Sequence, residues 1–242
     1  SLQNAFPKMH AMETQYRSRL KAMRARRRDS AYGGKRGGPS GPAGHLTSFM
    51  NGMSELITAL AAALGTERIS TGTGAEFVQY HGPGDFTVHT NGAAFHTEAV
   101  VLAIPAWNAA PLVGGFAPEV QADLDAIGGA PAAVAALGFR RDEVSHPLQG
   151  FGFLIPRGQG LRILGSLWSS SIFPGRAPEG KVLLRTILGG AHSPELVEQE
   201  DDAMIELVRR DLRSAMGIDA VPVFQRIHRY SRGIPQYEVG HQ

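Results

Sequence analysis

The glycine-rich stretch Gly72-Thr73-Gly74-Ala75-Glu76-Phe77 comes closest in this chain to a dinucleotide-binding fingerprint. In that fingerprint, G-x-G-x-x-G follows a strand and opens a helix, because its glycines let the backbone approach a pyrophosphate. Here Phe77 stands where the third glycine belongs, and a strand pattern follows it. We therefore expect no phosphate-binding loop at this point, and any bound dinucleotide would place its phosphates elsewhere.

The other residue types that could carry side-chain chemistry are scattered along the chain. There are nine histidines and no cysteine, and no pair of histidines has the H-x-x-x-H spacing of a helical metal site. A G-x-S-x-G nucleophile turn is absent from the sequence. The acidic run Glu200-Asp201-Asp202 falls in a predicted helix, where a solvated face is expected. The sequence thus gives no support for a metal site, for hydrolase chemistry or for a catalytic acid–base pair. We expect the histidines to be surface or hydrogen-bonded structural residues.

Positive charge is concentrated in one segment of the chain. The 242 residues are 43% hydrophobic and carry a net charge of +2. Residues 17–36 alone contain nine basic residues and one acidic residue, so this segment carries +8 and the remainder −6. The segment overlaps a predicted amphipathic helix, whose apolar stripe is Leu2, Phe6, Met9, Met12, Tyr16, Leu20 and Met23.

A basic amphipathic helix fits an anionic membrane surface, with a solvated helix face as the alternative. A nucleic-acid partner is not expected, because no helix-turn-helix or aromatic platform accompanies the basic run. No run of 18 apolar residues is present that could span a membrane. The lack of cysteine and of a signal peptide favours the cytoplasm, with a peripheral position on the cytoplasmic membrane.

The remaining sequence alternates between helical and strand patterns, which predicts an α/β or α+β fold of roughly two lobes. Helices are predicted at 53–64, 118–127 and 194–216. Strands are predicted at 77–80, 85–90, 93–96, 132–139, 150–156, 162–168, 181–188 and 221–230. The apolar run 99–104, which ends at Pro105, is predicted to be a strand buried on both faces.

Several short sequences, in this order, resemble the protoporphyrinogen oxidases, FAD-dependent enzymes of haem synthesis in the amine-oxidase-like flavoprotein superfamily. They are AFPKM at 5–9, FMNGMSEL at 49–56, VVLAIPA at 100–106, GFGFLIP at 150–156, SSIFPGRAP at 170–178 and GIPQYEVGH at 233–241. Each is weakly specific alone, but together they cover nearly the whole chain.

The resemblance implies a partial FAD-binding domain and a substrate domain built on a mixed sheet with flanking helices. The corresponding segments are a membrane-associated helical region at 1–32, a Gly/Pro-rich linker at 33–44, part of the FAD domain at 45–106, the substrate domain at 107–233 and a return toward the FAD domain at 234–242. The family's G-x-G-x-x-G strand and terminal flavin segment have no counterpart here. We therefore expect a central fragment that is inactive alone and does not hold FAD tightly.

The resemblance also implies roles for particular residues. Ala75 matches a position whose backbone contacts the adenine of FAD, and Tyr230 matches an aromatic near the isoalloxazine. Residues that would line the flavin are Ala103, Ile104, Pro105 and Ala106. The family's partner for the substrate carboxylate lies upstream of Ser1.

An apolar pocket for a tetrapyrrole is expected from Phe151, Leu154, Leu167 and Ile187. Strand alternation places Phe151 and Leu154 on opposite faces unless the strand bends at Gly152, and core packing is the competing explanation for all four residues.

The implied activity is the oxygen-dependent oxidation of protoporphyrinogen IX to protoporphyrin IX by FAD. The alternatives are a coproporphyrinogen oxidase, another member of the superfamily such as a carotenoid desaturase or amine oxidase, and a non-catalytic binding or membrane-associated module. The implied partners are a tetrapyrrole substrate and a second copy of the chain in a homodimer.

Overall fold

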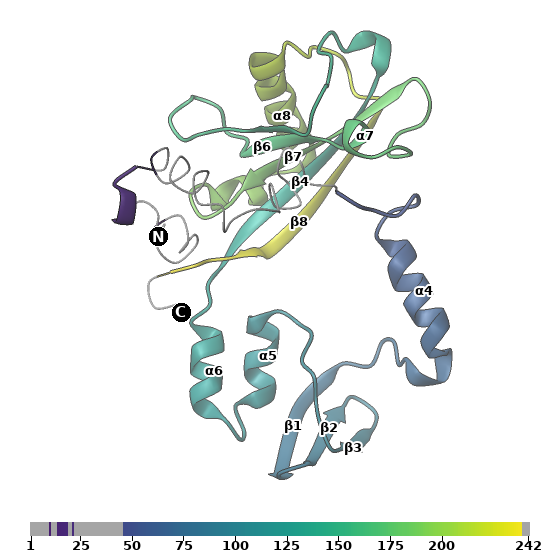
Figure 1. The fold of residues 1–242 in the computed structure, drawn as a ribbon, viewed down its shortest axis with the longest axis vertical. Helices are drawn as coiled ribbons and strands as arrows, with labels where there is room; N and C mark the ends of the chain where they lie inside the picture. Colours follow the sequence, from purple (N-terminus) through teal and green to yellow (C-terminus); the bar gives the residue numbers. More distant parts are fainter. Residues whose placement is uncertain (1–9, 11–13, 19–20, 22–45, 239–242) are drawn as a thin grey trace. The chain divides into compact units, whose positions relative to one another are not determined.

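The computed structural model describes residue 10, residues 14–18, residue 21 and residues 46–238. The predicted basic helix and the Gly/Pro-rich linker lie almost entirely outside these residues. The chain divides into two compact units (Figure 1). We call the part containing residues 55–127 the first unit, and the part containing 50–54 and 128–236 the second unit.

Residues 54–127, which are all described, form a small antiparallel sheet and three α-helices of the first unit. Its sheet has the order β1-β2-β3, formed by Ala75–Gly82, Asp85–Thr90 and Ala94–Thr97. Its helices are α4 (Ser54–Leu64), the 3-10 turn η2 (Thr66–Arg68), α5 (Ala106–Val113) and α6 (Pro118–Asp125). The predicted hairpin turn at Asn91-Gly92 is confirmed, since the Thr90 amide donates to the Ala93 carbonyl at 2.9 Å. Helix α5 was not predicted from the sequence.

Two histidines of the first unit have structural partners. Thr87, which is buried, places its hydroxyl 2.9 Å from Nε2 of His81 and 3.0 Å from Nδ1 of His96. A hydroxyl both donates and accepts, so it can satisfy one ring nitrogen of each histidine. The ring of His89 stacks on Phe77 with centroids 4.1 Å apart. These three histidines are therefore hydrogen-bonded or stacked within the sheet.

The prediction of a buried strand at 99–104 is wrong. These residues form no strand, and Val101 is 88% exposed. Their apolar character therefore does not reflect burial between the described elements. Helix α4 is confirmed, yet it too buries no residue, and Ile57 on its apolar stripe is 69% exposed.

The second unit is a five-stranded antiparallel sheet in the order β5-β6-β7-β4-β8. The strands are β4 (Gly129–Arg140), β5 (Gly152–Leu154), β6 (Gly165–Trp168), β7 (Lys181–Gly189) and β8 (Phe224–Pro235). The long strands β4 and β8 lie side by side along the unit (Figure 1). The helical segments are the 3-10 turns η3 (Arg141–Glu143) and η4 (Pro194–Glu198), and the helices α7 (Ser169–Ile172) and α8 (Asp201–Met216).

One face of this sheet packs against α8 and forms the core. Alternate residues of β7, namely Val182, Leu184, Thr186 and Leu188, are buried there. They meet α8 through Met204, Ile205, Val208 and Leu212, which recur at helical spacing. Burial of the apolar side chains at this interface stabilises the unit. Among the described residues, no helix is long and apolar enough to cross a membrane.

The helix predicted at 194–216 is broken into η4 and α8. The break at Gln199 and Glu200 is held by Arg229 of β8, which donates to the carbonyls of Val197 at 3.1 Å and Gln199 at 2.6 Å and pairs with Asp201. A guanidinium fork can satisfy several acceptors in this way, so the extended backbone at this point is stabilised without helical hydrogen bonds.

Candidate functional site

The face of the five-stranded sheet opposite α8, which we call the open face, brings together residues from all five strands. One row across this face is defined by strand register and consists of Leu154, Gly165, Ile187, Val134 and His228. The next row consists of Gly152, Leu167, Arg185, Ala136 and Arg226. Neighbouring strands lie about 4.8 Å apart, and the two rows are two residues, or about 7 Å, apart along each strand, so they form one continuous surface.

Four of the predicted site residues share this surface. Leu154 and Ile187 belong to the first row and Leu167 to the second, while Tyr230 stands opposite Ala132 on β4, two residues along from Val134. Leu154 is 80% exposed and Tyr230 is 53% exposed, so neither belongs to the core. Core packing therefore does not account for these two side chains.

Phe151 precedes β5 at a bend in the chain. Gly150 and Gly152 have φ of +128° and +133°, conformations that favour glycine. The chain therefore bends at Gly152, which is the condition under which Phe151 and Leu154 could lie on the same face. Phe151 is 55% exposed, whereas Phe153 packs against the core, so the two phenylalanines have different environments.

The middle of the open face is built from small residues. Gly165 lies beneath the side chain of Leu154, since a Cβ at Gly165 would stand 2.9 Å from Leu154 Cδ2 and closer still to the Phe153 carbonyl oxygen. Ala136 and Gly138 continue this low floor along β4. A planar or gently curved apolar molecule can approach the sheet over such a floor, with the larger side chains at its sides.

Two arginines of the open face were missed by the sequence interpretation. Arg185 and Arg226 lie in one row, on either side of Ala136. Nε of Arg185 donates to the Ser169 hydroxyl at the start of α7, at 2.8 Å. The signal that could have revealed them is the composition of the strands, because the five strands contain no Asp or Glu.

The first unit holds the other predicted residues. Ala75 begins β1 and pairs with Thr90, and it is exposed. Ala103, Ile104 and Pro105 are exposed and lead into α5, which begins at Ala106. The Pro105 carbonyl accepts the amides of Asn108 and Ala109 at 2.9 and 3.0 Å, and this fixes the turn into the helix.

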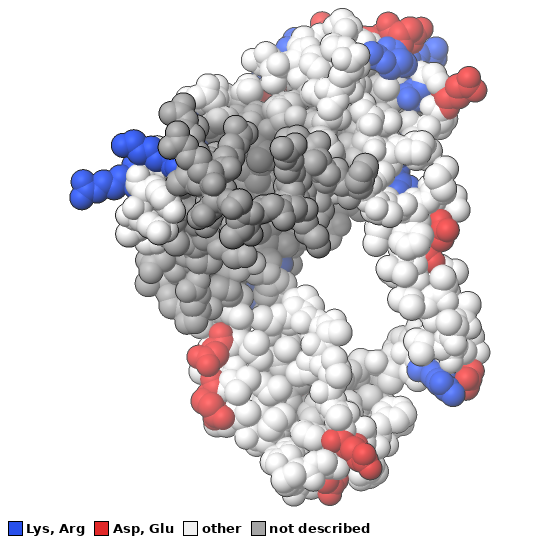
Figure 2. Space-filling model, in the orientation of Figure 1, with Lys and Arg blue, Asp and Glu red and all other residues white. Residues whose placement is uncertain are grey.

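Residues 55–127 of the first unit are strongly acidic. They contain eight Asp and Glu and a single basic residue, Arg68. Several of these acidic side chains are visible on the face shown in Figure 2.

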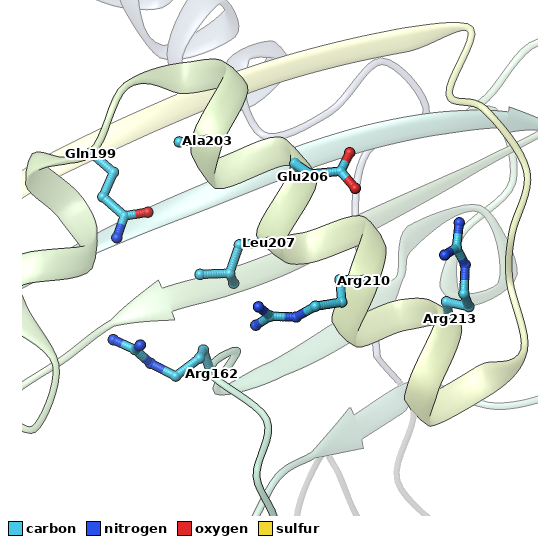
Figure 3. A pocket seen from close by; sticks show the side chains of 7 residues that line it. All are labelled: Arg162, Gln199, Ala203, Glu206, Leu207, Arg210 and Arg213. Carbon is cyan, nitrogen blue, oxygen red and sulfur yellow. The ribbon is translucent and has the colours of Figure 1, made fainter.

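A separate pocket of about 450 Å³ lies beside α8, on the core side of the sheet (Figure 3). It is lined by Arg162, Gln199, Ala203, Glu206, Leu207, Arg210 and Arg213. Each of its arginines is paired with a carboxylate: Arg162 with Glu195 at 2.7 Å, Arg210 with Asp211 at 3.0 Å, and Arg213 with Asp219. The pocket therefore offers no unpaired charge, and none of the predicted site residues lines it.

The chain belongs to the family described as flavin containing amine oxidoreductase, which matches residues 9–242. This confirms the predicted superfamily and the α/β (α+β) fold class, and the family implies a flavin cofactor. A solved structure from Exiguobacterium sp. 255-15 has the same fold, with a TM-score of 0.75 over 99% of this chain and 24% identity. Reduced UDP-galactopyranose mutase shares it less closely, with a TM-score of 0.62 over 78% of this chain.

Among curated relatives, the chain is 32% identical over 211 residues to the chloroplastic protoporphyrinogen oxidase of Nicotiana tabacum, covering 80% of this chain and 37% of the relative. It is 28% identical over 242 residues to the coproporphyrinogen III oxidase of Bacillus subtilis (strain 168), covering 100% of this chain and 50% of the relative. The chain thus spans half or less of the length of these two relatives.

Proposed function

We propose that this chain supplies the substrate-binding sheet and part of the flavin-binding region of an FAD-dependent oxidase that converts protoporphyrinogen IX to protoporphyrin IX with O2. The observation that carries the proposal is the open face, where Leu154, Leu167 and Ile187 come together around a floor of small residues. An exposed apolar surface of this kind, next to polar side chains, is typical of a site for a large apolar ligand. The names of the curated relatives supply the substrate class.

The residues proposed to hold FAD fit that role. Ala103 and Ala106 themselves have small side chains, so a ring system can approach the backbone closely at these two positions, and Pro105 fixes the direction of the segment. Near Ala75, a Cβ built on Gly72 or Gly74 meets no atom within 4 Å, so this backbone is sterically open to an adenine. FAD, when bound, accepts a hydride from the substrate and passes the electrons to O2.

On this proposal the protein contributes binding and orientation. Leu154, Leu167 and Ile187 hold the apolar macrocycle and displace water from it, which favours binding by the hydrophobic effect. Tyr230 on the same face presents its aromatic ring at the side of β8, where it can pack against the flavin or the macrocycle. Such positioning brings the reacting carbon to the hydride acceptor without an acid–base pair of side chains.

Coproporphyrinogen III is the second candidate substrate. It is favoured by the match to the Bacillus subtilis coproporphyrinogen III oxidase along all 242 residues. It carries more carboxylates than protoporphyrinogen IX, and the open face presents the two cationic residues Arg185 and Arg226. A strong preference of the open face for negatively charged ligands would therefore favour coproporphyrinogen III over protoporphyrinogen IX as the substrate.

The test uses the full-length protein containing these residues, supplied with FAD and O2. Each porphyrinogen is added in turn, and formation of the porphyrin is followed by its fluorescence. We expect oxidation of protoporphyrinogen IX and a large loss of activity for Leu167→Asp, because a carboxylate would be placed in the apolar wall. Leu164→Asp, a substitution at another partly exposed leucine outside the rows, is the control. Oxidation of coproporphyrinogen III alone would favour the second candidate substrate, and oxidation of neither porphyrinogen would refute the proposed function.

A further inference from the structure

We propose that Arg185 and Arg226 bind carboxylates of the tetrapyrrole, one from each side of the floor at Ala136. The inference rests on the proposed function and adds the polar contacts that orient the substrate on the open face. It names residues of this chain that would bind the carboxylates of the ligand.

The first argument is position. Arg185 and Arg226 both stand opposite Ala136, on strands β7 and β8, which flank β4. Their Cα atoms are therefore separated by two strand spacings, about 10 Å. Both side chains rise from the face that carries Leu167 and Ile187, so a ligand lying over the small residues of β4 has a guanidinium on either side.

The second argument is that these charges lack counter-ions. In the described part of the chain, no carboxylate pairs with Arg185 or Arg226, and the strands of the sheet contain no acidic residue. Arg229, on the α8 side of β8, differs sharply, since it pairs with Asp201 and donates to two backbone carbonyls. Arg229 is therefore a structural residue, whereas the two arginines of the open face are available for an anion.

The third argument is that Arg185 is held in place. Its Nε donates to the Ser169 hydroxyl at 2.8 Å, and Ser169 is itself buried at the start of α7. This hydrogen bond uses Nε of the guanidinium and leaves the two terminal nitrogens, Nη1 and Nη2, for a ligand. That pair of N–H groups matches the two oxygens of a carboxylate.

The surroundings specify a ligand that is both apolar and anionic. Leu167 is the neighbour of Arg185 in the row, and Ile187 is the next residue of β7 on the same face. A small inorganic anion would contact the arginines without covering these side chains. A porphyrin or porphyrinogen covers both, because its carboxylates extend from the rim of an apolar macrocycle.

The experiment measures binding of three probes to the full-length protein by titration of porphyrin absorbance. The probes are coproporphyrin III, protoporphyrin IX and protoporphyrin IX dimethyl ester, which has no free carboxylate. We expect Arg185→Ala and Arg226→Ala each to weaken binding of the two acids about tenfold or more, since each removes a charge-assisted contact. The affinity for the ester is expected to stay within about twofold, and added salt is expected to weaken only the acids.

Two further variants serve as controls. Arg213→Ala removes the same charge from α8, on the other side of the sheet, and is expected to bind all probes like the wild type. Ser169→Ala releases Arg185 without removing it, so binding of the acids should weaken less than in Arg185→Ala. Should Arg185→Ala fold poorly by circular dichroism, Arg185→Gln retains most of the side-chain volume and replaces it.

Unchanged affinity of both alanine variants for the acids, with the wild type binding them, would overturn this inference and leave the proposed function standing. Equal weakening for the acids and the ester would also overturn it, because the loss would then reflect shape and not charge. If the wild type binds none of the three probes, the proposed function itself fails, and the inference fails with it.

Discussion

Replacing Asp211 tests how the hairpin that carries Leu154 and Leu167 is fixed to the rest of the second unit. Asp211 is only 1% exposed within α8, and one of its carboxylate oxygens accepts the backbone amides of Arg162 at 2.6 Å and Ile163 at 3.1 Å. The other oxygen accepts two N–H groups of Arg210. The carboxylate therefore anchors the segment between β5 and β6 to the helix.

The expected cost of Asp211→Ala follows from these contacts. Each buried amide left without an acceptor costs about 1–3 kcal/mol. The amide of Ile163 is buried, whereas that of Arg162 is only partly buried, so water can replace some of the second loss. The pair with the largely exposed Arg210 adds little. We expect the free energy of unfolding to fall by about 2–4 kcal/mol.

Asp211→Asn should fall between Asp211→Ala and the wild type. Its amide oxygen can accept the two backbone amides, but its NH2 group then faces the donors of Arg210. Urea denaturation followed by fluorescence gives the free energies, and hydrogen exchange of residues 155–164 reports on the anchored segment. Asp202→Ala removes an exposed acid from the same helix as the control. The reasoning is refuted if Asp211→Ala unfolds at the same urea concentration as Asp202→Ala.

Three other substitutions follow from the same geometry. Gly152→Ala should lower the free energy of unfolding by about 2–4 kcal/mol, because the added Cβ would collide with the Ser166 carbonyl. Gly158→Ala is the control, since Gly158 has a positive φ but open space around it, and it should cost about 1 kcal/mol. Equal urea midpoints for the two variants would contradict this reasoning. Thr87→Val should destabilise the first unit by about 1–3 kcal/mol in urea denaturation, with Thr87→Ser close to wild type, since the serine restores the hydroxyl shared by two histidines. Arg229→Lys keeps the charge but loses the fork, so residues 197–201 should exchange their amide hydrogens faster than in the wild type; unchanged exchange would argue against Arg229 as the clamp.

The local patterns of the sequence predicted most elements, because alternation and helical spacing are set by burial. Strand β2 has the predicted bounds, Asp85–Thr90, and the strand predicted at 181–188 differs from β7 by one residue. The strand predicted at 162–168 is shorter, since β6 begins only at Gly165. Its first amides are taken by Asp211, which is 48 or 49 residues away, and no local pattern indicates such a contact.

The apolar run 99–104 shows the converse limit. Its composition matches a buried strand, yet no described strand pairs with it. The hydrophobicity of a segment indicates that it tends to be buried, but it does not indicate which element of the fold packs against it. For the candidate site, the resemblance supplied Leu154, Leu167 and Ile187, and register placed them together. Arg185 and Arg226 could not be paired from sequence alone, because their proximity depends on the order of β7, β4 and β8.

The position of β8 at the edge of the sheet bears on how two copies of this protein could associate. Strand β8 is at the edge of the sheet and pairs with β4 along one side, and no described strand occupies its other side. An exposed strand of twelve residues is ordinarily a template for adding a strand from another molecule. Here Arg226 lies on the strand with no carboxylate partner among the described residues, and a second β8 would bring the same charge alongside. A charged side chain on an edge strand works against joining two sheets edge to edge, so a homodimer would be expected to form through another surface.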